Sequence, residues 1–216
     1  MKKDSAKEKE KQRKLSPAEE KRLKRFEETC AELERQGYVK KELTVGIVKA
    51  NVVTMLLAIP ICAVCVLLFH LVNPGSSYAL DFTGLIVWLV SMFALTVVHE
   101  GVHGLTWSRF SPNGFGDIDF GFMKEYLTPY CTCAKPLSRG AYIAGALMPL
   151  IVLGILPWIV SILCGSVLLL YIALTMILAA GGDMLIVLEL LKHPARTAEQ
   201  LIYDHPTQAG CVVFER

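Results

Sequence analysis

Four long apolar segments follow a polar N-terminal region and dominate the hydropathy pattern of the chain. They cover about residues 51–72, 82–107, 141–164 and 167–191. Each is close to the ~20 residues that an α-helix needs to cross a hydrocarbon core of about 30 Å. Prolines inside such helices are tolerated, because neighbouring groups bind the carbonyl oxygens that proline leaves free. The pattern therefore predicts four transmembrane helices.

A charged helix is predicted before the first apolar segment. Residues 1–15 are rich in Lys, Glu and Gln and have no apolar period, so we expect them to be disordered. A helix is predicted over residues 16–37, with Ser16 as its cap, Pro17 at the first helical position and Glu19 three residues after the cap. Its apolar residues recur at helical spacing on one face: Leu23, Phe26, Cys30 and Leu33. This face favours two interpretations equally, binding to a membrane surface or partner, and docking onto the rest of the same chain.

The connection between the second and third apolar segments, residues 108–140, has a different pattern. Polar and apolar residues alternate over 117–120, and residues 128–133 favour β-structure. A short two-stranded element is predicted, and its aromatic residues place it against the bilayer interface. The predicted fold is an all-α membrane protein, with four transmembrane helices and a short β-hairpin-like connection between spans two and three. Residues 38–216 then form one four-span domain.

The charges are unevenly distributed and predict an orientation. Residues 1–50 contain 15 of the 22 Lys and Arg residues. The rest of the chain is too apolar for a nucleic-acid-binding protein, and the lipid bilayer is its expected partner. Among the connections, 73–81 and 165–166 contain no Lys or Arg, whereas 108–140 and both chain ends are basic. Because basic loops remain on the cytoplasmic side, both termini are expected in the cytoplasm.

The second apolar segment contains the sequence His99-Glu100-Gly101-Val102-His103. Residues four apart lie on one face of a helix, so the two histidines can bind a single ion with Glu100 beside them. This is the H-E-x-x-H zinc motif. Ionisable side chains at the centre of a membrane helix cost about 2.5–3.5 kcal/mol each, which metal coordination would offset. The structural alternative is a hydrogen-bonded polar cluster that joins helices.

A hydrolytic zinc site needs a third protein ligand, and Asp183 in the fourth apolar segment is the candidate. Asp183 and His99 each lie eight residues before the predicted end of their segment, which places them at equal depth. The adjacent Gly182 permits close helix packing. The alternative is a packing or proton-relay aspartate. Other candidates are expected elsewhere: His70 and His193 at the membrane edges, Asp204 and His205 in a solvated tail, and Cys131 and Cys133 as packed thiols.

These features resemble the site-2 protease type of intramembrane metalloprotease. More specifically, the chain resembles a family of bacterial membrane proteins described as putative zincin peptidases. The resemblance covers about four fifths of the chain and is carried by five segments: Gly37-Tyr38, His99-Glu100-Gly101-Val102-His103-Gly104, Pro129-Tyr130-Cys131, Ala146-Leu147-Met148-Pro149-Leu150 and Gly182-Asp183.

The resemblance implies three zinc ligands and one general base: His99, His103 and Asp183 for the metal, and Glu100 for the proton. Site-2 proteases place their aspartate before a glycine, whereas Asp183 precedes Met184. No counterpart of their substrate-positioning asparagine lies near Pro149, so no residue is assigned to oxyanion stabilisation.

The leading hypothesis is a zinc-dependent peptidase in a bacterial cell membrane, acting on a membrane-protein or peptide substrate within or at the cytoplasmic edge of the bilayer. Two rival hypotheses stay open. One is a metal-binding membrane protein without hydrolysis, such as a sensor or carrier. The other is a structural membrane protein that binds a partner through the helix at 16–37.

Overall fold

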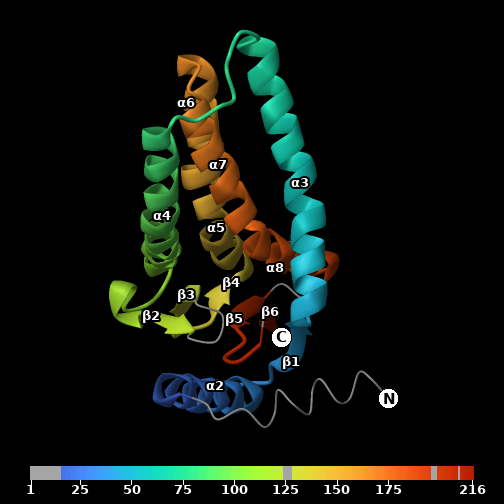
Figure 1. Ribbon diagram of the computed structural model, residues 1–216. Helices are drawn as coiled ribbons and strands as arrows, with labels where there is room; N and C mark the ends of the chain where they lie inside the picture. The colour runs from blue at the N-terminus through green and yellow to red at the C-terminus, as the bar shows by residue number, and fades with distance from the viewer. Residues whose placement is uncertain (1–15, 124–127, 196–198, 209) are drawn as a thin grey trace.

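Long helices form a bundle, and the strands gather at one end of it (Figure 1). The computed structural model describes residues 16–123, 128–195, 199–208 and 210–216. The segment 1–15, for which disorder was predicted, lies outside these residues. The connections without Lys or Arg, 73–81 and 165–166, lie together at one end of the bundle. The described chain ends and the described residues of the connection, 109–123 and 128–138, lie at the other end.

Three helical stretches are long and apolar enough to cross a membrane. They are α3 (Ile47–Val72), α4 (Phe82–Ser108), and the continuous stretch Arg139–Cys164, made of α5 (Arg139–Pro149), η2 (Leu150–Ile155) and α6 (Leu156–Cys164). Their most apolar windows have mean hydropathies of 2.9, 2.0 and 2.5. Large apolar side chains are exposed along them, as expected for helices that face lipid. These features are compatible with an integral membrane protein.

The fourth apolar segment, predicted as one span over 167–191, is a pair of helices with a bend between them. It consists of α7 (Val167–Ala179) and α8 (Gly181–Lys192), bent by 43° between them. The described residues thus contain three candidate spans, or four if the bent pair is one span. Gly181 lies at the bend, where a Cβ atom would be only 2.2 Å from Thr54 Cγ2 of α3. The missing side chain lets α8 begin directly against α3.

Two small antiparallel sheets cover the basic end of the bundle. The predicted hairpin is confirmed: β2 (Ile118–Met123) pairs with β3 (Thr128–Cys133), after the short helix η1 (Gly114–Asp117). The second sheet was not predicted, so the all-α class was too narrow. Its order is β1-β6-β5-β4, from β1 (Val39–Thr44), β6 (Gly210–Glu215), β5 (Gln200–Asp204) and β4 (Leu137–Ser138). It joins segments that are far apart in the chain, which local patterns do not reveal.

Helix α2 (Pro17–Arg35) docks on this second sheet. Its N-terminus has the expected capping box, in which Ser16 and Glu19 each bind the backbone N–H of the other. Three residues of its apolar face are buried against the sheet: Phe26, Cys30 and Leu33 pack against Tyr203, Val212 and Phe214. Of the two interpretations of this face, the structure shows docking onto the same chain.

Replacing Phe26 with Ala should loosen α2 from the sheet. Phe26 is the largest apolar residue of the helix and is buried, so we expect a loss of about 3–5 kcal/mol in unfolding free energy. Limited proteolysis should cut within residues 17–35 faster than in the wild type. Glu28→Ala, on the exposed face of the same helix, is the control, and equal proteolysis of both variants would contradict the docking.

Candidate metal centre

The two histidines of the H-E-x-x-H motif face each other on α4. Both are buried, with exposed fractions of 7% for His99 and 4% for His103. Their Nε2 atoms are 3.1 Å apart, and the rings meet edge to face with centroids at 4.8 Å. The helical repeat places them on one face, as their spacing predicts.

Asp183 lies in the first turn of α8 and completes the cluster. Its Oδ2 is 3.2 Å from His99 Nε2, and its Oδ1 is 3.5 Å from His103 Nε2. One ligand atom from each of the three residues can be chosen so that all lie within 4.8 Å of one another. The structure therefore brings together the three residues that the sequence proposed as metal ligands.

The separations fit a small tetrahedral ion. A tetrahedron with bonds of about 2.0–2.1 Å, the usual zinc–nitrogen length, has edges of about 3.3 Å. The observed separations of 3.1–3.5 Å lie around this value. His103 Nδ1 is 2.9 Å from the carbonyl oxygen of Gly145. This bond requires a proton on Nδ1, so the Nε2 atom of the neutral imidazole presents a lone pair to the cluster. Two imidazole nitrogens and one carboxylate form a donor set that zinc accepts, with one position left for a further ligand.

Glu100, also a residue of α4, lies next to the cluster on the side of the hairpin. The backbone N–H of Cys131, in β3, is oriented toward its carboxylate. Strand β2 crosses α4 one turn further on, where a Cβ atom on Gly104 would lie 2.5 Å from Phe120 Cζ. The hairpin thus rests against α4 beside Glu100, and Gly104 makes this close approach possible.

The remaining candidates lie away from the three ligands. His70 bonds to Tyr78 through Nδ1 at 3.3 Å, and His193 contacts Glu215 at 2.9 Å. Cys131 and Cys133 are buried free thiols in the core, in agreement with the packing interpretation.

The prediction of a solvated tail for Asp204 and His205 is wrong, because this region is part of the sheet. Asp204 is the last residue of β5, and its Oδ1 accepts a hydrogen bond of 2.7 Å from the Tyr142 hydroxyl.

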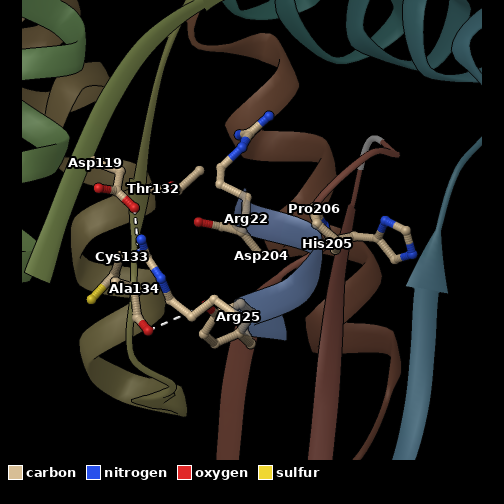
Figure 2. A pocket seen from close by; sticks show the side chains of 10 residues that line it. Arg22, Arg25, Asp119, Thr132, Cys133, Ala134, Asp204, His205 and Pro206 are labelled. Atoms are coloured by element: carbon tan, nitrogen blue, oxygen red, sulfur yellow. Dashed lines mark hydrogen bonds and ion pairs between the residues drawn. The ribbon is translucent and has the colours of Figure 1, made fainter. Parts of the chain in front are cut away.

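A hollow lies beneath α2 (Figure 2), but it is too small for a substrate. Its volume is about 10 Å³, the space of one water molecule. Arg25 of α2 binds Asp119 of β2 at its edge, and the Arg22 guanidinium lies 4.1 Å from the centre of the Tyr130 ring. These contacts tie α2 to the hairpin that covers Glu100. Burial raises the pKa of Asp204, which also lines this hollow, to about 6.

Comparison with known proteins gave one finding. A family model described as putative zincin peptidase matches residues 92–198. The match supports the zincin peptidase family. It spans slightly less than half of the chain and includes all four candidate residues of the metal centre. No curated protein and no solved structure matched the chain significantly.

The raised pKa of Asp204 predicts a pH-dependent stability. Between its ordinary value of 3.8 and the folded value of about 6, the folded protein holds a proton that the unfolded chain releases. The contribution of Asp204 to stability should therefore fall by roughly 2 kcal/mol as the pH rises from 4 to 7. Chemical unfolding in mild detergent should show this fall in the wild type and lack it in Asp204→Asn. The same pH dependence in both proteins would contradict the assignment.

Proposed function

We propose that the protein is a zinc-dependent peptidase of the membrane, cleaving peptide bonds within the bilayer or at its cytoplasmic edge. The observation that carries the proposal is the convergence of His99, His103 and Asp183 on one point, with Glu100 beside them. Three further features support it: the zincin peptidase match, the apolar helices around the cluster, and separations between the ligand atoms that match the edges of a tetrahedron around zinc.

Each residue of the centre has a distinct task in this mechanism. His99 and His103 would hold zinc through Nε2, and Asp183 through its carboxylate. Bound zinc would polarise the scissile carbonyl group and lower the pKa of a water molecule to about 7. Glu100 would act as the general base, accepting a proton from the attacking water on a carboxylate oxygen and returning it to the leaving amine.

The substrate must be extended at the cleavage point, because the peptide bonds of a helix are shielded by their own hydrogen bonds. The hairpin of β2 and β3 lies beside Glu100 and offers strand backbone with which an extended segment can pair. A membrane protein or a membrane-bound peptide is therefore the proposed substrate class. We propose a bacterial cell membrane as the location, with the sheets and both termini on the cytoplasmic side.

The metal content of the purified protein tests the ligand set. We expect about one zinc ion per chain in the wild type and loss of zinc in both His103→Ala and Asp183→Ala, since three protein ligands hold the ion. Elemental mass spectrometry of the detergent-purified proteins measures this. His70→Ala, at the other end of the bundle, should keep its zinc. A folded wild type without stoichiometric metal would contradict the zinc site and favour the alternative, a structural polar cluster.

Glu100→Gln separates hydrolysis from metal binding. We expect zinc to remain bound while cleavage of fluorescently labelled casein falls about 10²–10⁴-fold, because an amide cannot accept the proton. Glu189→Gln, where the native carboxylate pairs with Lys192 at the end of α8, is the matched control and should cleave normally. Retained cleavage in Glu100→Gln would remove the general-base role. Zinc binding without any cleavage in the wild type would favour the sensor or carrier hypothesis.

A further inference from the structure

Proline at position 149 leaves a backbone carbonyl free at the place where His103 needs a partner. In an α-helix the N–H of residue 149 would donate to the carbonyl of residue 145. Pro149 has no N–H, and the next N–H, that of Leu150, donates to Leu147. The Gly145 carbonyl instead accepts the bond from His103 Nδ1 at 2.9 Å.

We propose that Gly145 and Pro149 form a Gly-x-x-x-Pro element of α5 that positions His103 as a metal ligand. This proposal rests on the proposed zinc site and adds residues that touch neither metal nor substrate. Pro149 frees the carbonyl, and the carbonyl holds the proton on Nδ1. The opposite nitrogen, Nε2, then faces His99 and Asp183 with its lone pair.

Position 145 requires glycine because the Trp107 ring, a second contact of His103, occupies the space that a Cβ atom would need. A Cβ atom there would lie 2.0 Å from Trp107 Nε1 and 2.1 Å from Trp107 Cδ1. The Trp107 indole fills this space and stacks on the His103 ring, with centroids at 5.0 Å and an interplanar angle of 16°. The indole also stacks on Tyr142, with centroids at 5.7 Å, and its Nε1 donates to the Tyr142 carbonyl at 3.2 Å.

The two contacts fix different properties of the imidazole. The Gly145 carbonyl sets the tautomer and the direction of the ring axis, and the Trp107 indole sets the plane of the ring. His103 and Trp107 are both at most 5% exposed, so water does not compete for these positions. His99 has no equivalent support: its Nδ1 is buried without a partner among the described residues. The positioning is therefore specific to His103.

Pro149→Ala tests the element, because helix propensity and metal affinity should change in opposite directions. Alanine favours the helix over proline and restores an N–H that competes for the Gly145 carbonyl. We expect zinc affinity, measured by competition with a chelator in detergent, to fall about 10–100-fold. The metal-free protein should unfold at the same or a higher temperature. The visible ligand-field bands of bound Co²⁺ should also shift.

Pro157→Ala is the matched control, since Pro157 lies in the same helical stretch, two residues beyond the end of the π-helical segment. Its zinc affinity and Co²⁺ spectrum should equal those of the wild type. Zinc affinity of Pro149→Ala within twofold of the wild type, with an unchanged Co²⁺ spectrum, would overturn the proposal. An equal loss in both proline variants would overturn it too, because the effect would then belong to the helix as a whole.

A second pair of variants covers the case in which Pro149→Ala does not fold. Trp107→Leu removes the ring that stacks on His103, and should weaken zinc binding at least about tenfold. Trp158→Leu removes an indole of the same size on α6, whose Nε1 donates to the Cys65 carbonyl at 3.0 Å, and should bind zinc normally. Equal affinities in the two tryptophan variants would overturn the positioning role.

The tautomer of His103 in the metal-free protein separates this proposal from the proposed function. Nitrogen-15 NMR of histidine-labelled wild type should show the proton on Nδ1 of His103, identified by its absence in His103→Ala. In Pro149→Ala the resonance should change. If the wild type binds no zinc, the peptidase proposal fails, whereas this spectrum still decides the positioning. An Nδ1 atom of His103 without a proton in the metal-free wild type would overturn the proposal.

Discussion

The constraint on which the structure depends is the burial of ionisable side chains among apolar helices. Two imidazoles and a carboxylate cost free energy there unless they bind one another or an ion. The helices around them are shaped to bring these groups together. Gly181 lets α8 start directly against Thr54 of α3, and the bend of 43° before it sets the direction of α8. At the far end of α8, Arg139 donates to the carbonyls of Leu190 and His193 at 2.7 and 3.0 Å. Asp183 is thus carried by a helix that is held at both ends.

The sheets link the helices that carry the metal centre to the surface of the bundle. Arg139 also binds Gln200 at the start of β5, so the support of α8 continues into the four-stranded sheet. Helix α2 packs on that sheet and reaches the hairpin through the ion pair of Arg25 with Asp119. The hairpin lies on α4 at Gly104, one turn from Glu100. The polar end of the molecule therefore connects, contact by contact, to the side chains at the metal centre.

The sequence predicted the features that depend on local periodicity. A spacing of four placed His99 and His103 on one face, and counting from the segment ends placed Asp183 at the depth of His99. Alternation predicted the pairing of β2 with β3. The four-stranded sheet could not be predicted in this way, because β1 pairs with β6 across most of the chain length and its exposed residues carry no core pattern. The bend at Ala180 depends on packing between α8 and α3 and has no signal of its own. Gly145 was missed, although Pro149 four residues later marks its carbonyl as free.

With both histidines neutral, the arrangement of lone pairs favours a metal ion over a purely structural cluster. Because the Gly145 carbonyl requires a proton on His103 Nδ1, the Nε2 atom of a neutral His103 is an acceptor, as are both oxygens of an ionised Asp183. Neutral His99 has one N–H to offer. If that proton is on Nε2, it can satisfy one of the facing acceptors, and Nδ1 remains a buried acceptor without a partner among the described residues. If the proton is on Nδ1, the three residues present only acceptors to one another, at 3.1–3.5 Å. A cluster selected for hydrogen bonding would balance donors and acceptors, whereas a cation at the centre accepts every lone pair that these residues offer.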